Sequence, residues 1–309
     1  MSSLFKKIVI AVVVLAVAAA LAGLYYAFTP ETEIIEDGVA RINLSGPIQT
    51  MGSPFADMII TPSRVEEKLQ RAEETRGIEA VVMHVDSPGG SVAASQEIYD
   101  MIDDYDMPVV MTMGDMAASG GYYISAPADA IIARPGSMTG SIGVIFTLYD
   151  PDELLDNIGI EREIIKSGEH KDMFSRSPEE DEREIIQNMS DTAYDQFIQA
   201  IVEGRDMDEE EVRELATGEI YMGSQAKDLG LVDELGGYSK ALELAGEMAE
   251  LDDPTYHELP EPPLFRQLFS LSAEAVNYIR YSQIDYELKM LERLESGLSP
   301  ALKYKVPGY

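Results

Sequence analysis

Short apolar runs alternate with stretches of helical spacing along most of this chain. Runs rich in Val, Ile, Met and Ala predict buried strands at residues 39–44, 78–85, 108–113 and 130–133. Apolar positions that recur every three or four residues predict helices at residues 63–75, 91–105, 119–125, 178–202, 208–216, 223–229 and 239–250. Strands that alternate with helices at this interval favour an α/β fold with a largely parallel sheet.

One apolar run is much longer than the others. Residues 8–28 contain no charged side chain, with Lys6 and Lys7 before them and Glu31 after them. Because a bilayer core requires about 20 apolar residues in a helix, this run predicts one N-terminal transmembrane helix. The paired lysines predict a cytoplasmic N-terminus at the cell membrane, with the rest of the chain outside. The alternative is a cleaved signal peptide, whose apolar core is usually only about 7–15 residues long.

These patterns divide the chain into three parts. Residues 1–29 are the predicted anchor, and residues 30–251 are predicted to form the α/β domain. The segment 252–263 is acidic and rich in proline, which is typical of a domain edge. We therefore expect residues 252–309 to be a Pro-rich linker followed by a helical tail.

The composition is strongly acidic. The 56 acidic and 23 basic residues give a net charge of −33, which argues against nucleic acid as a partner because its phosphates would be repelled. A charge of this size favours a solvated surface adapted to high salt, with ordinary acidic solubility as the alternative. The chain has no cysteine, and its three histidines are too scattered for metal-ligand spacing. We therefore expect neither a metal nor another cofactor.

The strongest candidate for chemistry is Ser119. It follows a buried strand within the segment Met-Ala-Ala-Ser-Gly-Gly-Tyr-Tyr, so it lies where α/β folds place their ligands. The amide of Gly120 would lie at a helix N-terminus next to this hydroxyl, where it can donate to an oxyanion. The alternative role for Ser119 is to cap the helix that follows it.

A second glycine-rich turn precedes the first by about 30 residues. In the segment Asp-Ser-Pro-Gly-Gly, the amides of Gly89 and Gly90 offer a second oxyanion donor and a surface for an extended peptide. Ser91, which comes directly after them, is a rival nucleophile, although we expect it to cap the next helix.

A serine nucleophile also needs a base, and no histidine lies between His84 and His170. We expect His84 to be a hydrogen-bonded core residue, because it falls within an apolar strand. Lys166 and Lys171 are the stronger candidates, with His170 ranked below them and solvated surface charge as the alternative role. A lysine base must lose its proton, against a reference pKa of about 10.4, so it needs desolvation. The acidic field opposes this loss, and we therefore expect activity to rise with salt.

Four sequence blocks together resemble one known family. They are DSPGGSV at residues 86–92, MAASGGYYIS at 116–125, TGSIGV at 139–144 and KSGEHKDMFS at 166–175. The chain thereby resembles the signal peptide peptidase A family of serine–lysine membrane proteases. It resembles the short form found in archaea, which carries a single copy of the catalytic domain.

The resemblance implies a role for each matching residue. Ser119 would be the nucleophile, Lys171 the general base and Ser141 the residue that orients the lysine. Gly120 would supply one oxyanion amide and the Gly89–Gly90 turn the other. The resemblance also implies a Clp-protease/crotonase-like fold of repeated β-β-α units. The family's short forms assemble as homo-oligomeric rings in which neighbouring subunits complete each site, so Ser119 and Lys171 are expected to meet across an interface.

The resulting hypothesis is a membrane-anchored serine endopeptidase that degrades remnant signal peptides or other membrane-derived peptides. Small pocket walls at Gly114, Ala117 and Ala118 would favour small or apolar substrate side chains. Two alternatives remain open: a related serine–lysine protease that cuts one membrane partner protein, and a non-catalytic oligomeric scaffold of the same fold. Acyl-CoA chemistry of the crotonase type is less favoured, because it would not require this serine and lysine.

Overall fold

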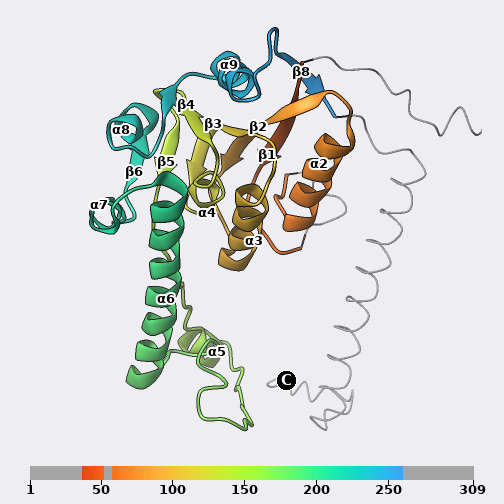
Figure 1. Ribbon diagram of the computed structural model, residues 1–309. Helices are drawn as coiled ribbons and strands as arrows, with labels where there is room; N and C mark the ends of the chain where they lie inside the picture. The colour runs from red at the N-terminus through yellow and green to blue at the C-terminus, as the bar shows by residue number, and fades with distance from the viewer. Residues whose placement is uncertain (1–36, 52–57, 260–309) are drawn as a thin grey trace, which may run out of the picture. The chain divides into compact units, whose positions relative to one another are not determined.

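A mixed sheet of eight strands organises the residues that the structure describes. The computed structural model (Figure 1) describes residues 37–51 and 58–259, which lie within one unit, Ile34–Leu259. The predicted anchor at residues 8–28 and the tail from residue 260 lie outside them. Within the described ranges, no helix has both the length and the apolar character needed to cross a membrane.

Most predicted elements are present, with ends that differ by a few residues. The strands are β1 (Gly38–Ser45), β2 (Ile78–Ser87), β3 (Val109–Ala118), β4 (Ala130–Ala133), β5 (Met138–Gly140), β6 (Ile220–Met222), β7 (Glu234–Leu235) and β8 (Thr255–Glu258). The helices are α2 (Pro62–Glu74), α3 (Val92–Asp103), α4 (Gly120–Tyr123), α5 (Asp152–Asn157), α6 (Glu180–Arg205), α7 (Glu209–Leu215), α8 (Gly223–Asp228) and α9 (Tyr238–Met248).

The sheet is parallel apart from one strand pair. Its order is β6-β5-β3-β2-β1-β8, and β4 pairs with both β3 and β7. Only β5 and β6 run antiparallel among the pairs of described strands. Because the central strands share one direction, the turns that follow β2 and β3 open at the same edge of the sheet.

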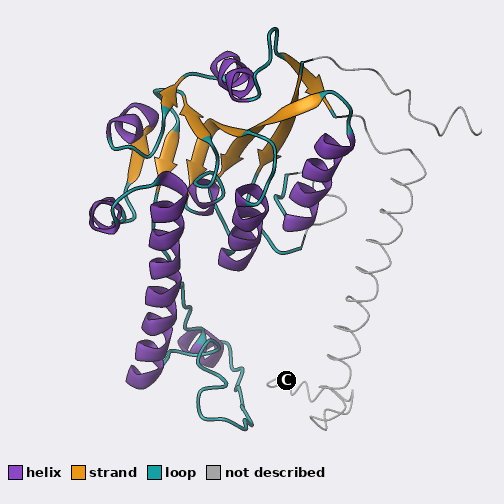
Figure 2. Ribbon diagram, in the orientation of Figure 1, coloured by secondary structure: helices purple, strands orange, loops and turns teal. Residues whose placement is uncertain are grey.

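Helices cover both faces of this sheet (Figure 2). On one face, α2, α3, α4 and the second half of α6 pack on the larger core, which includes Met83, Met111 and Ile198. On the other face, α9 packs through Ala241 and Ala245 on a smaller core. Successive residues of a strand point to opposite faces, so β2 and β3 contribute to both cores.

Four strands of the sheet, β5 to β8, were not predicted from the sequence, and β5 and β8 show why. The three residues of β5 are too few to show an alternating pattern, yet β5 pairs with the end of β3. The strand β8 lies in the segment that composition marks as a linker, and it pairs with β1. The sheet therefore continues past residue 252, and the compact unit ends at Leu259.

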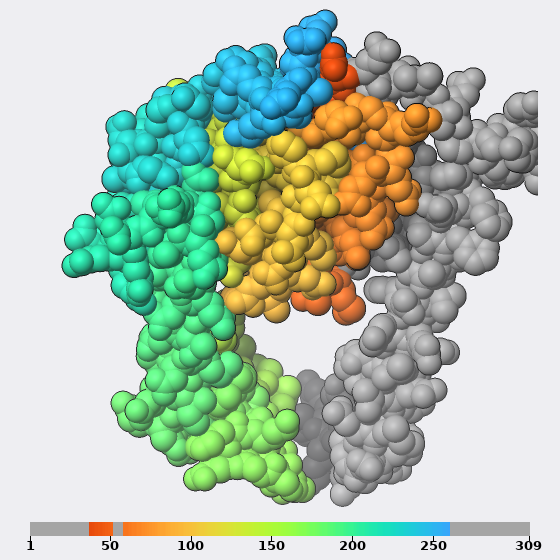
Figure 3. All heavy atoms as spheres, in the orientation of Figure 1, coloured from red at the N-terminus to blue at the C-terminus, as the bar shows by residue number. Residues whose placement is uncertain are grey.

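An arm formed by residues 145–178 and the first half of α6 extends away from the sheet (Figures 1 and 3). The arm carries α5 and the block that contains Lys171. Several of its large apolar side chains are exposed, namely Ile145, Phe146, Tyr149, Leu154, Ile158, Ile160, Ile164, Ile165 and Phe174.

Candidate active site

Ser119 lies in a strained turn between β3 and α4. Its φ of 53° and ψ of −122° form a backbone conformation that non-glycine residues rarely adopt. Two backbone contacts hold the turn: the Ser119 amide donates to the Gly140 carbonyl at 2.8 Å, and its own carbonyl accepts from Tyr122 at 2.9 Å. The Ser119 side chain makes no capping hydrogen bond to α4. A sharp strand-to-helix turn of this kind presents a hydroxyl at the sheet edge, as hydrolase nucleophile turns do.

The two glycine-rich turns lie directly against each other. Gly89 has a φ of 93°, and a Cβ there would lie 2.6 Å from the Gly120 nitrogen and 2.9 Å from the Ser119 Cβ. A Cβ at Gly120 would lie 2.7 Å from the Ser95 Oγ and 3.1 Å from the Gly90 nitrogen. Glycine is therefore required at both positions, because any side chain would separate the two turns.

The contact leaves two amides beside Ser119 without a protein acceptor. The Gly89 amide donates to Ser87 Oγ at 3.1 Å, so it is already used. Among the described residues, neither the Gly90 amide nor the Gly120 amide donates to a protein group. This arrangement offers two donors for a carbonyl oxygen next to one hydroxyl.

Ser141 is brought to the same edge by β5. The register pairs Ala118 with Gly140, so Ser141 follows the residue whose carbonyl binds the Ser119 amide. Ser141 has a φ of 49°, and its amide donates to the Glu219 carbonyl at 2.7 Å. No hydrogen bond joins the Ser119 and Ser141 side chains in the described part of the chain.

Lys171 is not brought to this edge within one chain. It is an exposed residue of the arm, and its amide lies 3.4 Å from the Gly168 carbonyl. In residues 37–51 and 58–259, no hydrogen bond or ion pair of the Lys171 side chain is found. The sequence-predicted site thus divides into two parts: Ser119, Ser141 and the glycine turns at the sheet, and Lys171 on the arm.

A cluster of ion pairs fixes the backbone around Lys171. Arg176 binds Glu182 through two hydrogen bonds of 2.8 Å, and its Nε lies 3.1 Å from Asp172. Lys166 lies 2.6 Å from the same Asp172 carboxylate. Glu182 is only 2% exposed, and it accepts a hydrogen bond from the Glu179 amide in the capping box of α6. Lys166 is therefore committed to an ion pair, and among the residues that the structure describes Lys171 is the amine of the block without a side-chain partner.

The cluster also holds its carboxylates in the charged form. Hydrogen bonds from Lys166 and Arg176 lower the pKa of Asp172 to about 2. The Glu179 amide, together with Arg176, lowers the pKa of Glu182. His170 lies 3.5 Å from Glu182, which places it within this cluster and away from Ser119.

Three further predictions can be compared with the structure. Ser91 caps α3, since its side chain accepts from the Ala94 amide at 3.4 Å, as expected. His84 is hydrogen-bonded to Thr112 but is only half-buried and faces a cavity, so its assignment to the core is wrong. Gly114 lines that same cavity and Ala117 is buried in the larger core, which does not match their predicted place in a substrate pocket.

Comparisons with known proteins identify the family. The model of peptidase family S49 matches residues 102–252. An Enterococcus faecium protein named "Putative signal peptide peptidase SppA" is 36% identical over 238 residues, which cover 73% of this chain and 69% of that protein. The chain belongs to peptidase family S49. Two longer relatives are matched over about a third of their length. The chloroplastic serine protease SPPA of Arabidopsis thaliana is 31% identical over 71% of this chain and 32% of its own length. Protease 4 of Haemophilus influenzae is 36% identical over 58% of this chain and 30% of its own length.

Membership of this family confirms two expectations from the sequence. The S49 protein is a serine peptidase, which favours the enzyme over the non-catalytic scaffold. The Clp protease model matches residues 48–138, which supports the expected Clp-protease-like α/β fold with a mixed sheet. Within the described residues of this S49 peptidase, no group of three His, Cys, Asp or Glu side chains is arranged to hold a metal ion.

Sequence reasoning missed the residues that support the site. Asp86 accepts a hydrogen bond from the Met116 amide at 3.1 Å across an irregularity in the β2–β3 pairing. Thr139 donates to the Ala117 carbonyl at 2.7 Å and thereby joins β5 to the end of β3. Both residues occur in the motif blocks of this S49 peptidase, but only the strand pairing shows what their side chains contact.

Proposed function

We propose that the chain is a membrane-anchored serine endopeptidase in which Ser119 is the nucleophile and Lys171 is the general base. The observation that carries this proposal is the turn at Ser119. Its hydroxyl makes no capping hydrogen bond and lies beside two amides that have no acceptor among the described residues. A strained, preorganised nucleophile next to oxyanion donors is what acyl transfer requires.

The proposed reaction proceeds in two steps. Ser119 Oγ attacks the peptide carbonyl as Lys171 removes the hydroxyl proton, and the amides of Gly90 and Gly120 bind the oxyanion. The lysine then passes the proton to the departing amine, and the C–N bond breaks to leave an ester on Ser119. Water hydrolyses this ester by the same route and releases the new carboxylate. Ser141 would hold the lysine amine in line with Ser119.

We assign the base of each site to a neighbouring copy of the chain in a homo-oligomeric ring. Two features of the arm support this: Lys171 has no side-chain partner within the described residues, and the apolar side chains around it are exposed. Ile145 and Ile165, for example, are 88% and 92% exposed. Burial of these side chains against a second copy would be favourable and would remove water from the lysine, as a lysine base requires.

The location and the substrate follow from the predicted anchor. A chain held in the cell membrane by residues 8–28, with its catalytic domain outside the cytoplasm, would meet membrane-derived peptides, and remnant signal peptides are the substrate we propose. The name of the Enterococcus faecium relative supports this choice. We further propose the short, single-copy form found in archaea, and each motif block occurs once within these 309 residues. Cleavage of a specific membrane partner protein is the alternative, and profiling with peptide libraries separates the two.

Peptide cleavage by the full chain tests the proposal. Lys171→Ala should lower kcat/KM by roughly 10²–10⁴-fold, the range for a general base. Ser119→Ala, which removes the nucleophile, should lower it by roughly 10⁶-fold. Ser91→Ala, which removes only a helix cap, should keep most of the activity. Activity retained in either of the first two variants would rule out the dyad.

Mixing the two inactive variants tests whether neighbouring copies share each site. In a mixed ring, the intact Ser119 of one copy can meet the intact Lys171 of the next, so activity should return after joint refolding. If Ser119 and Lys171 of the same chain form the site, the mixture stays inactive and the shared arrangement is wrong.

A further inference from the structure

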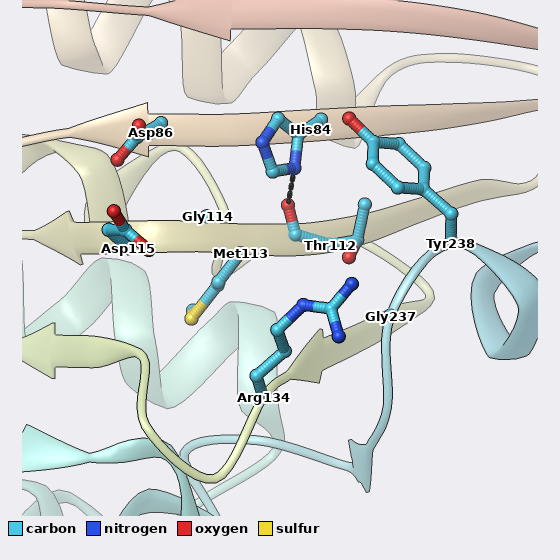
Figure 4. Close-up of a pocket in the computed structure, with 9 residues that line it drawn as sticks. All are labelled: His84, Asp86, Thr112, Met113, Gly114, Asp115, Arg134, Gly237 and Tyr238. Atoms are coloured by element: carbon cyan, nitrogen blue, oxygen red, sulfur yellow. Dashed lines mark hydrogen bonds between the residues drawn. The ribbon is translucent and has the colours of Figure 1, made fainter.

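A polar cavity lies on the opposite face of the sheet from α3 and α4. On β2, Ala80 and Val82 pack under α9, and the next residues of the same face are His84 and Asp86. Helix α9 does not cover His84 and Asp86, and a cavity of about 230 Å³ lies beside them, which we call the His84 cavity (Figure 4). Its lining residues are His84, Asp86, Thr112, Gly114, Arg134 and Tyr238, with Met113, Asp115 and Gly237.

One side of the His84 cavity carries an unpaired cation. Arg134 is exposed at the rim, and within the described ranges its side chain makes no hydrogen bond or ion pair, although the chain has more than twice as many acidic as basic residues. A Cβ at Gly237 would lie 2.7 Å from an Arg134 Nη, so glycine leaves room for the guanidinium. The guanidinium points into the cavity in Figure 4. A planar, fork-shaped donor of this kind is suited to a carboxylate.

The other side of the cavity carries acceptors. Asp86 uses one carboxylate oxygen for the Met116 amide, and the exposed Asp115 lies beside it in Figure 4. His84 Nδ1 lies 3.1 Å from the Thr112 carbonyl, so this nitrogen carries the hydrogen and Nε2 is left as an acceptor. Burial lowers the pKa of His84, which favours this neutral form.

Packing contacts hold two aromatic rings that line the cavity, those of His84 and Tyr238. The ring of Tyr238 lies 5.0 Å from the ring of His84, and the Arg41 guanidinium lies 4.6 Å above the Tyr238 ring. The Tyr238 hydroxyl donates to Asn43 at 3.2 Å. These contacts hold the His84 and Tyr238 rings in place before any ligand arrives, which lowers the entropic cost of binding against them.

We propose that the His84 cavity binds a small zwitterion, with its carboxylate on Arg134 and its ammonium towards Asp86 and Asp115. Its volume is below the roughly 300–1,000 Å³ of pockets for drug-sized ligands, so the occupant is a free amino acid or a dipeptide. Both are end products of peptide hydrolysis. The cavity would thus be a product-binding site on the face of the sheet away from Ser119.

Calorimetric titration of the full-length Ser119→Ala chain tests this inference without any need for catalysis. Ala-Ala with free ends and free alanine are titrated separately to decide between the two occupants. Ala-Ala should bind at a single saturable site. N-acetyl-Ala-Ala and Ala-Ala-amide, which each lack one charge, should bind at least about tenfold more weakly, because each leaves a charged group of the cavity unpaired.

Substitutions in the cavity complete the test. Arg134→Gln should weaken Ala-Ala binding at least tenfold, and Asp115→Asn should weaken it to a smaller extent. Arg76→Gln is the matched control, since Arg76 is also exposed, lies at the other end of β2 and lines no part of the cavity. Three results would each overturn the inference: no saturable binding of either ligand at millimolar concentration, equal binding of Ala-Ala-amide, or equal loss in Arg134→Gln and Arg76→Gln.

Discussion

At the scale of single residues, the candidate site depends on backbone conformations that most side chains avoid. Ser119 and Ser141 both have positive φ values, and so does Gly89, with a φ of 93°. Each of these residues is held by strand pairing or by a neighbouring turn rather than by its own preference. For Ser119 and Ser141 this strain costs roughly 1–3 kcal/mol each, so the surrounding sheet must stabilise it, whereas Gly89 adopts its positive φ readily.

The contact between the glycine turns gives a sharp prediction. Gly89→Ala places a methyl group 2.6 Å from the Gly120 nitrogen, so the turns must separate and the two free amides no longer converge. We expect kcat/KM to fall by roughly 10²–10³-fold, the loss seen when an oxyanion donor is removed. Gly136→Ala is the matched control, because a Cβ there meets no atom within 4 Å. If both variants hydrolyse peptide at similar rates, Gly89 has no part in the site.

At the scale of elements, the arm combines a fixed backbone with an unpaired lysine. The capping box at the start of α6 and the Arg176–Glu182 pair hold the arm in place, whereas the second half of α6 packs on the larger core through Phe197 and Ile201. The arm therefore presents Lys171 from a rigid base, which a lysine shared between subunits would need.

The pH dependence of stability should report on this ionic cluster. The pKa values of Asp172 and Glu182 are lowered in the folded chain. The cluster therefore stabilises the fold above the ordinary carboxyl pKa of about 4, and this stabilisation fades as the pH falls towards 2. Arg176→Met leaves the buried Glu182 without its cation, so we expect the midpoint of acid unfolding to rise by roughly half a pH unit.

Circular dichroism across an acid titration measures that shift. Arg183→Met serves as the control, since Arg183 is exposed on the same helix and, among the described residues, its side chain bonds only Ser177 Oγ, at 3.5 Å. Identical midpoints for the Arg176 and Arg183 variants would show that the cluster does not contribute to stability.

The sequence predicts the main elements well but not how the site is assembled. The strands β1 to β4 have clear apolar runs, and the Ser119 and Gly89 turns follow from motifs at their ends. The short strand β5, which positions Ser141, has no pattern that three residues could show, and β8 lies within a Pro-rich segment. The pairing of Lys166 with Asp172, six residues further on, depends on the fold of the loop.

At the scale of the whole molecule, the net charge of −33 opposes the chemistry that we propose. A negative field favours protonated amines, yet the base must be neutral to accept a proton from Ser119. Added salt weakens this field, because the Debye length falls from about 10 Å at 0.1 M to about 3 Å at 1 M.

Activity should therefore respond to salt beyond any gain in folding. The ascending limb of kcat/KM against pH should move to lower pH as salt is raised from 0.1 to ~1 M, under conditions where circular dichroism shows the chain folded at both concentrations. If the ascending limb of the pH profile lies at the same pH at both salt concentrations in folded enzyme, the acidic surface does not act on the catalytic base.

The most direct test of the central claim is to identify the residue that a fluorophosphonate labels, by mass spectrometry of the full chain. We predict one adduct, on Ser119, which forms roughly 10²–10⁴-fold more slowly in Lys171→Ala and is absent in Ser119→Ala. An adduct on Ser91 or another serine, or labelling of Lys171→Ala at the unaltered rate, would contradict the account.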